Sequence, residues 1–172
     1  YLTVQARPVQ SALKRLFDIV VSAAVLTLLS PLFVAVAIAI KLTSRGPVLF
    51  KQERVGLHGG VFHMLKFRSM VANAEDLRAA LEKKNEQTGP VFKIEHDPRI
   101  TTVGRFIRKL SIDELPQFIN VLRGEMAIVG PRPPIPSEVA KYEPWQRRRL
   151  SVRPGITCVW QVSGRSEISF EQ

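Results

Sequence analysis

A long run without a charged residue, from Ile19 to Ile40, constrains this chain more than any other feature of its sequence. As one helix the run is long enough to cross a bilayer, which takes about 20 apolar residues. Ser30-Pro31 interrupts it near the middle, and proline there removes the backbone hydrogen bond to the Thr27 carbonyl. Membrane helices tolerate such a break when other groups satisfy the backbone, so a spanning helix is not excluded.

Three structures compete for this run. A signal peptide would fit the basic Lys14 and Arg15 before it and the small residues 35–37, although the run is long for one. A single spanning helix fits the length. A re-entrant helix–break–helix would enter one leaflet and return, because the halves 19–30 and 31–40 are each too short to span alone. Basic residues flank both ends alike, so the residues leave spanning and re-entrant structures open.

The charge of the chain limits its partners. A formal net charge of +10 predicts an anionic partner, which could be nucleic acid, an anionic membrane surface or a phosphorylated substrate. Asp18 follows Lys14 by one helical turn and predicts an ion pair at the membrane interface. The single cysteine, Cys158, excludes an internal disulfide, and the three scattered histidines make no zinc-binding spacing with it.

The remainder predicts short strands and helices. Two strands at about 48–54 and 61–67 surround the glycine-rich turn 56–60, whose glycines match no nucleotide-binding motif. A helix is expected over 73–87, followed by a short strand near 91–95 and a turn at Asp97-Pro98. Helical spacing then groups Arg105, Arg108 and Lys109, and a later helix ends at Gly124 before a short apolar strand.

The segment "LSIDELPQF" places two carboxylates side by side in a basic region. Ser111 and Glu114 have the spacing of a capping box, and Pro116 suits the first position of a helix. On either reading Asp113 and Glu114 lie at a helix N-terminus, close to Arg108, where we expect them to be ionised. Capping explains Ser111 and Glu114 but gives the neighbouring cationic residues no role. A nucleophilic carboxylate for phosphoryl transfer would use the carboxylates and the cations together.

Two further basic segments suggest contact with anions. Prolines on both sides of Arg132, in "GPRPP", would hold its backbone extended and its guanidinium ready for a diphosphate. The tail combines Trp145 and Trp160 with several arginines, a pattern suited to a membrane interface or to single-stranded nucleic acid. These arginines are Arg147, Arg148, Arg149, Arg153 and Arg165.

Several motifs occur together in a recognisable order. The broken apolar run is followed by "RVG", "KFRSM", "DPRITTVGRFIRKLSIDELPQFINVLRGEMAIVGPRP" and "RPGIT…WQVSGR". Together they resemble the bacterial sugar transferases, the monotopic polyprenyl-phosphate phosphoglycosyl transferases. The resemblance covers nearly the whole chain from about Leu13 onward. One position differs from the family pattern: Ala127 stands where relatives often carry serine. We expect relatives to continue past Gln172 with another aromatic, acidic segment.

The resemblance implies a reaction. A sugar 1-phosphate, most in keeping with a hexose such as glucose or galactose, would pass from a UDP-sugar to undecaprenyl phosphate with release of UMP. This would be the first membrane step of exopolysaccharide, O-antigen or capsule synthesis. Asp113 would attack the sugar-linked phosphate, and Glu114 would hold the Mg²⁺ that the family requires. The implied phosphate-binding residues are Lys66, Arg68, Arg108 and Arg132.

The resemblance also implies an architecture. It favours the re-entrant structure, with the helix break at Ser30 and Pro31 and both ends in the cytoplasm of a bacterial inner membrane. The expected fold is α/β and α-rich, with a re-entrant membrane helix at 13–45 and a cytosolic and interfacial catalytic part at 46–172. Residues 1–12 would be the remnant of a linker. Expected partners are a UDP-sugar, undecaprenyl phosphate and membrane lipids, not nucleic acid. The tail and the helix of 72–87 also offer surface for a homodimer.

One alternative function belongs to another class. The composition alone would also suit a membrane-anchored basic module that binds anionic lipid or nucleic acid without catalysis. Such a module should bind polyanions more tightly when Asp113 and Glu114 are neutralised, whereas an enzyme should lose turnover. Nucleic-acid binding should also weaken steeply with salt, and the chain has no helix-turn-helix or RNP signature.

Overall fold

The computed structural model describes residues 8–74, 76–77 and 97–158. The chain divides into two compact units. The first unit comprises Tyr1–Leu29, Lys51–Leu65 and Pro116–Gln172, and the second unit comprises Ser30–Phe50 and Lys66–Leu115. Each unit joins segments that are far apart in the sequence, so long-range packing holds each of them together.

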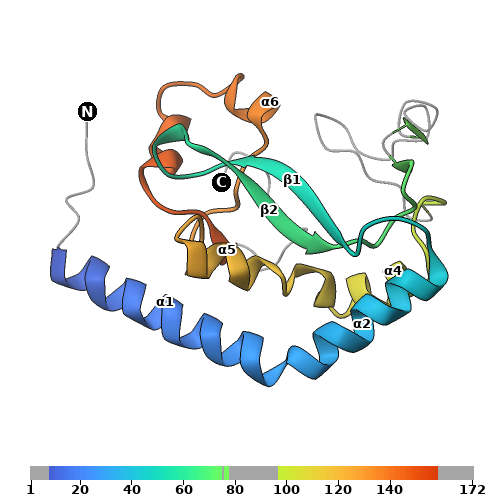
Figure 1. Ribbon diagram of the computed structural model, residues 1–172. Helices are drawn as coiled ribbons and strands as arrows, with labels where there is room; N and C mark the ends of the chain where they lie inside the picture. The colour runs from blue at the N-terminus through green and yellow to red at the C-terminus, as the bar shows by residue number, and fades with distance from the viewer. Residues whose placement is uncertain (1–7, 75, 78–96, 159–172) are drawn as a thin grey trace. The chain divides into compact units, whose positions relative to one another are not determined.

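The apolar run forms two helices. α1 spans Pro8–Leu28 and α2 spans Ser30–Thr43, with Leu29 between them (Figure 1). Pro31 lies in the first turn of α2, where its missing N–H leaves no hydrogen bond unmade. The predicted helix break is confirmed. Among the described residues no single helix is long and apolar enough to cross a membrane, whereas the bent pair of α1 and α2 meets that criterion by length and composition.

The core of the second unit lies between α2 and α4, a helix that spans Thr102–Lys109. Val36 and Ile40 of α2 pack with Ile107 of α4 and with Phe67. The rings of Phe33 and Phe67 meet edge-on, with centroids 5.2 Å apart. The basic residues Arg105, Arg108 and Lys109 all lie on α4 and are exposed, so their expected helical grouping is confirmed. Burial of the apolar residues fixes the opposite face of α4.

The start of α4 is held against the chain that leaves β2. The Thr101 hydroxyl accepts a hydrogen bond from the Gly104 N–H at 2.9 Å, and the Thr101 N–H donates to the Ser69 carbonyl at 3.1 Å. Gly104 approaches Ser69 so closely that a Cβ at this position would collide with the Ser69 carbonyl. The glycine allows α4 to pack directly on backbone.

β1 (Leu49–Val55) and β2 (Val61–Phe67) form a two-stranded sheet with η1 (Leu57–Gly59) in the turn between them. The Gly56 N–H donates to the Gly60 carbonyl at 2.8 Å, which closes the turn. His58 and Gly59 both have positive φ, at 55° and 83°. The predicted hairpin is confirmed to within one residue at each end.

The first unit contains α5 (Gln117–Arg123), β3 (Ala127–Val129), α6 (Pro136–Val139), η4 (Gln146–Ser151) and β4 (Gly155–Thr157). β3 and β4 pair in parallel, with Ala127 opposite Gly155. α5 ends at Gly124 with φ of 84°, so the predicted C-cap and the apolar strand after it are both confirmed. The core of this unit is formed by Phe62, Met64, Val121 and Met126.

Two charged residues fasten α1 to the rest of the first unit. Asp18 forms the predicted ion pair with Lys14 at 3.1 Å, but it is also buried and accepts the Ile128 N–H at 3.2 Å. Arg15 donates to the carbonyls of Val121 and Leu122 at 2.6 and 3.0 Å, at the C-terminal end of α5. Asp18 therefore serves the fold as well as the helix surface, which the sequence pattern did not indicate.

The described part is a mixture of helices with two small sheets, so the α/β fold class is confirmed. Some predictions fall outside the described residues. They are the helix of 73–87 beyond Leu77, the strand near 91–95, and the tail residues Trp160 and Arg165.

Candidate active site

The two adjacent carboxylates lie in a single turn of 3-10 helix. This turn, η3, spans Ile112–Glu114 and follows Ser111, whose φ and ψ of 57° and 19° are left-handed. The expected capping box is wrong: Ser111 makes no side-chain cap, because capping requires an extended backbone at that position. α5 begins at Gln117, one residue after Pro116, so the carboxylates precede the helix rather than start it.

Glu114 pairs with a lysine from β2. The Nζ of Lys66 donates to Oε1 of Glu114 at 2.7 Å, and the two side chains are 24% and 37% exposed. A pair this exposed contributes little to stability. The pair places a cation beside the dyad formed by Asp113 and Glu114.

Asp113 is half-buried, and burial raises the pKa of its carboxyl above the ordinary value. The Glu114 charge adds to this rise, whereas the charges of Lys66 and Arg108 oppose it. The net shift in the pKa of Asp113 is upward because desolvation outweighs the charges of Lys66 and Arg108. A carboxylate that is costly to hold in ionised form is a stronger nucleophile once ionised, and perturbed pKa values concentrate at functional sites.

The structure brings three predicted site residues close to Asp113 within the second unit. Lys66 and Glu114 form their ion pair, and Arg108, exposed on α4, is near enough for its charge to lower the pKa of Asp113. These residues come from β2, η3 and the last turn of α4. The predicted grouping of the dyad with Lys66 and Arg108 therefore has a physical basis in the second unit.

Arg68 lies just beyond the end of β2 and is 6% exposed. Its Nη2 donates to the carbonyl and to the Oγ of Ser44, at 3.0 and 2.7 Å. In the part of the chain that the structure describes, neither Nε nor Nη1 of Arg68 has a hydrogen-bond partner. Ser44 was not singled out in the sequence, and no pattern there indicates that it would meet Arg68.

Arg132 belongs to the first unit and is exposed. The prolines that follow it are fixed to β1. The Pro133 carbonyl accepts from Nη1 of Arg54 at 2.9 Å, and the Pro134 carbonyl accepts the Val55 N–H, also at 2.9 Å. The expected rigidity of "GPRPP" thus has a structural basis, and the phosphate-binding role of Arg132 stays a prediction.

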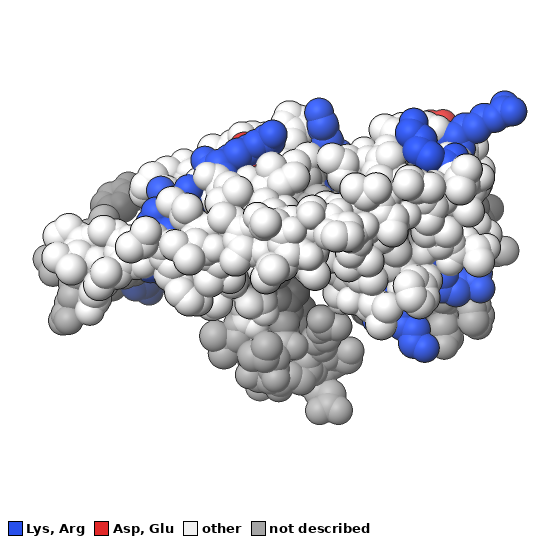
Figure 2. All heavy atoms as spheres, turned by 60° about the horizontal axis from the view of Figure 1, so that its bottom comes forward, with Lys and Arg blue, Asp and Glu red and all other residues white. Residues whose placement is uncertain are grey.

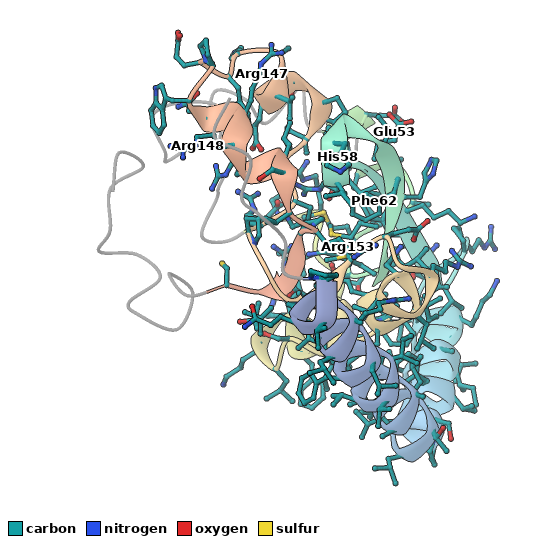
Figure 3. All side chains as sticks on the ribbon, turned by 90° about the vertical axis from the view of Figure 1, so that its left-hand side faces the viewer. Glu53, His58, Phe62, Arg147, Arg148 and Arg153 are labelled. Atoms are coloured by element: carbon teal, nitrogen blue, oxygen red, sulfur yellow. The ribbon has the colours of Figure 1, made fainter. Side chains whose placement is uncertain are left out.

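The arginines of the tail have more local roles than the sequence suggested. Arg147 and Arg148 lie on η4, which packs against the hairpin turn that carries His58 (Figure 3). The Arg149 guanidinium lies 5.9 Å from the centre of the Tyr142 ring, and Nε of Arg153 donates to the Gly124 carbonyl at 3.0 Å. At least two of these cations therefore serve the fold.

A buried ion pair close to the site was missed in the sequence. Arg99 donates from Nη2 to Asp97 at 2.7 Å and from Nη1 to the Ala74 carbonyl at 3.2 Å. Hydrogen bonding from Arg99 lowers the pKa of Asp97 despite burial. The backbone of this turn is tied to the end of β2 as well, because the Val71 N–H donates to the Arg99 carbonyl. The sequence signal for this pair is the segment Asp97-Pro98-Arg99, in which a turn at proline brings the aspartate and the arginine together.

The metal expected at Glu114 can be compared with the donors that surround it. Within residues 8–74, 76–77 and 97–158, no group of three or more histidine, cysteine or carboxylate side chains could hold a metal by itself. Mg²⁺ is commonly held by one or two carboxylates together with substrate phosphates. Asp113 and Glu114 supply that kind of incomplete set, so the residues present fit the ion.

The sequence matches the family model described as bacterial sugar transferase over residues 9–172. The chain belongs to the bacterial sugar transferase family. Among curated members of this family, the galactosyl transferase CpsE of Streptococcus agalactiae serotype III is 56% identical over 124 residues, 72% of this chain and 28% of CpsE. The exopolysaccharide production protein ExoY of Sinorhizobium fredii is 40% identical over 168 residues, 95% of this chain and 74% of ExoY.

A third bacterial sugar transferase relative has a more specific name. The undecaprenyl-phosphate glucose phosphotransferase of Komagataeibacter xylinus is 48% identical over 157 residues, which are 88% of this chain and 28% of that protein. The chain therefore spans most of ExoY but little more than a quarter of CpsE and of the glucose phosphotransferase. The family resemblance stated from the motifs is confirmed.

Proposed function

We propose that this chain is the catalytic part of a phosphoglycosyl transferase. It transfers a hexose 1-phosphate from a UDP-hexose to undecaprenyl phosphate, releases UMP, and so begins the assembly of an exopolysaccharide or related polymer. The observation that carries the proposal is the half-buried Asp113, with its raised pKa, beside the Glu114–Lys66 ion pair. The names of relatives that act on undecaprenyl phosphate and make exopolysaccharide support it.

In the first step an ionised Asp113 oxygen attacks the phosphorus that carries the sugar. The bond between that phosphorus and the oxygen bridging it to the uridine phosphate breaks, and UMP leaves with the electron pair. The product is an aspartyl phospho-sugar. No proton has to move, since the charge of the carboxylate passes to UMP. The charges of Lys66 and Arg108 are suited to stabilise the negative charge that gathers in this transition state.

In the second step an oxygen of undecaprenyl phosphate attacks the same phosphorus. The bond to Asp113 breaks and the carboxylate is regenerated, while the sugar phosphate stays on the lipid as a diphosphate. Two anions meet in each step, so cationic residues have to lower the repulsion. Arg68 is a further phosphate-binding candidate for this second step, and Arg132 is one for either step.

Glu114 would hold Mg²⁺, with Asp113 beside it. Such an ion would supply positive charge to the oxygens of the substrate diphosphate. The Lys66–Glu114 pair then has a second use, because Lys66 holds the Glu114 carboxylate in one place. The identity of the metal as Mg²⁺ rests on the resemblance.

The bent pair of α1 and α2 would attach the chain to the membrane in the re-entrant form, with both ends on the cytoplasmic face of the inner membrane. Large parts of the surface drawn in Figure 2 carry no charged side chains. Exposed apolar residues are numerous on both helices. They include Val9, Leu13, Leu16, Phe17, Val20 and Leu28 on α1, and Val34, Ile38 and Leu42 on α2. An aqueous face would not be expected to expose so many.

The proposal is tested by intact-protein mass spectrometry after brief exposure to UDP-glucose or UDP-galactose with Mg²⁺ and without lipid. A phospho-hexose adduct should form on the wild type and be absent from Asp113→Asn. The matched control is Asp76→Asn, which removes an exposed aspartate and should keep the adduct. An adduct that persists in Asp113→Asn would contradict the assignment of the nucleophile.

A further inference from the structure

Arg68 is a buried guanidinium whose hydrogen-bonding capacity is only partly used. It is 6% exposed, and of its three nitrogens only Nη2 has a partner in the described part of the chain, namely Ser44. Nε and Nη1 carry three of the five N–H groups of a guanidinium. A buried charge with unmade hydrogen bonds is costly to the folded state unless a partner satisfies it.

The space around Arg68 is shaped for the guanidinium. Gly46 has φ of 119°, and a Cβ on it would collide with Nη1 of Arg68. Glycine at 46 therefore serves both a left-handed backbone and a close approach of the arginine. Gly46 leaves space for Arg68 here, and among residues 8–74, 76–77 and 97–158 no carboxylate is a hydrogen-bond partner of Arg68. This arrangement suits an anion that arrives from outside the chain.

The position of Ser44 indicates which anion this is. Ser44 directly follows α2, whose exposed residues Val34, Ile38 and Leu42 are apolar. Exposed Lys41 and Arg45 lie at this same end of the helix. Apolar side chains that give way to cations are typical of a helix end at headgroup depth. The phosphate of a lipid lies at headgroup depth, whereas a soluble nucleotide binds from the aqueous phase and is not confined to this depth.

We infer that Arg68 and Ser44 form a subsite for the phosphate monoester of a lipid, which for the proposed reaction is the acceptor. This inference rests on the proposed function and divides the cations of the second unit between the two substrates. Lys66, paired with Glu114, serves the donor side, and Arg68 serves the acceptor side. The Ser44 hydrogen bonds fix the guanidinium, and Nε and Nη1, both buried, have no hydrogen-bond partner in the described part of the chain.

The test measures binding directly, so that it does not depend on turnover. Thermal unfolding of the full chain in detergent micelles is followed with increasing undecaprenyl phosphate, since a ligand of the folded state raises the unfolding temperature. Arg68→Lys and Gly46→Ala should weaken the apparent binding at least about tenfold, which corresponds to about 1.4 kcal/mol. Lys51→Gln, which removes one exposed cation from β1, is the matched control and should bind as the wild type does.

Competition separates the possible sources of the phosphate. Phosphatidic acid, a lipid phosphate monoester, should compete with undecaprenyl phosphate, whereas inorganic phosphate at the same concentration should not. Equal competition by inorganic phosphate would overturn the lipid assignment. Undiminished binding by both Arg68→Lys and Gly46→Ala would overturn the subsite itself.

Adduct formation from the UDP-sugar separates this inference from the proposed function. Arg68→Lys should form the Asp113 adduct at a rate within about threefold of wild type, roughly 0.7 kcal/mol, but discharge it to undecaprenyl phosphate at least about tenfold more slowly. Slowing of adduct formation alone would place Arg68 on the donor side and overturn the inference. A wild type that binds the lipid through Arg68 but never forms an adduct would contradict the proposed function and leave the subsite standing.

Discussion

The Nζ of Lys66 lies 2.7 Å from Oε1 of Glu114, so the cation from β2 is paired with the neighbour of Asp113 rather than with Asp113 itself. Lys66 still lowers the pKa of Asp113 through its charge, against the larger effect of burial. The pair thus limits the negative charge around Asp113 and moderates the rise in its pKa.

Replacing Lys66 should move the pH dependence of adduct formation. In Lys66→Met the cation that opposes burial is lost, so the pKa of Asp113 should rise further and the rate should reach half its maximum at a higher pH than in wild type. Lys66→Arg keeps the charge and should stay closer to the wild-type midpoint. The measurement is the initial rate of adduct formation against pH. A midpoint in Lys66→Met equal to that of wild type would show that Lys66 does not act on Asp113.

Asp113→Asn should abolish the adduct and yet make the fold more stable at neutral pH. The folded-state pKa of Asp113 is raised, so folding disfavours the carboxylate, and this cost is present above that pKa. The cost disappears as the pH falls below the ordinary aspartate value of about 3.9, where both states are protonated. Asparagine avoids it at every pH. Unfolding free energies of the variant and wild type should therefore differ at pH 7 and converge in acid.

The opposite result would be informative. Loss of stability in Asp113→Asn at pH 7 would mean that the carboxylate makes favourable interactions in the folded state that exceed its desolvation. Glu114→Gln serves as the comparison, because it breaks the ion pair with Lys66 at similar size. Comparison of the two variants shows whether the Asp113 carboxylate destabilises the fold, as expected of a desolvated nucleophile, or stabilises it, as expected of a structural carboxylate.

Elements set by local patterns could be predicted from the sequence. The hairpin at 49–67, the break before Pro31 and the C-cap at Gly124 all follow from glycine and proline chemistry, which acts over a few residues. The adjacency of Asp113 and Glu114 is likewise a local fact. The capping box at Ser111 is wrong because the backbone there is left-handed, which the spacing of Ser111 and Glu114 does not reveal.

Contacts between distant segments could not be predicted. Arg68 meets Ser44 across 24 positions, and Lys66 meets Glu114 across 48. Nothing in a single sequence specifies which of many serines or carboxylates a cation will reach. The resemblance to a family supplied the grouping of Lys66 with the dyad, but the burial that raises the pKa of Asp113 depends on packing.

The buried pair of Asp97 and Arg99 should be important for stability. Asp97→Asn removes one charge and leaves Arg99 buried and imperfectly paired, at a cost of about 3 kcal/mol. The pKa of Asp97 is lowered by Arg99, so its stabilising effect is complete above the ordinary aspartate value and is lost as the pH falls below it. Wild type and variant should therefore differ strongly at pH 7 and less below about pH 4.

Chemical denaturation at several pH values tests this prediction. The control is Asp76→Asn, which removes an exposed aspartate from the same unit and should change stability by no more than about 0.5 kcal/mol. A difference between Asp97→Asn and wild type that stays constant down to pH 3 would exclude the ionised Asp97 as its source.

Asn120 should tolerate substitution least where the new side chain cannot donate a hydrogen bond. It is fully buried; its Oδ1 accepts the Leu65 N–H at 3.0 Å, while Nδ2 donates to the His63 carbonyl at 2.8 Å and to Glu125 at 2.6 Å. Asn120→Asp keeps the size but sets a carboxylate against a carbonyl and the Glu125 carboxylate. The expected loss is about 3 kcal/mol at pH 7. Burial and Glu125 would raise the pKa of the new carboxyl, so the loss should shrink as the pH falls.

Asn73→Asp, at an exposed asparagine, is the matched control and should remain within about 0.5 kcal/mol of wild type. Unfolding at pH 7 and pH 5 measures both, and wild-type stability of Asn120→Asp at pH 7 would refute the assignment of Nδ2 as the donor.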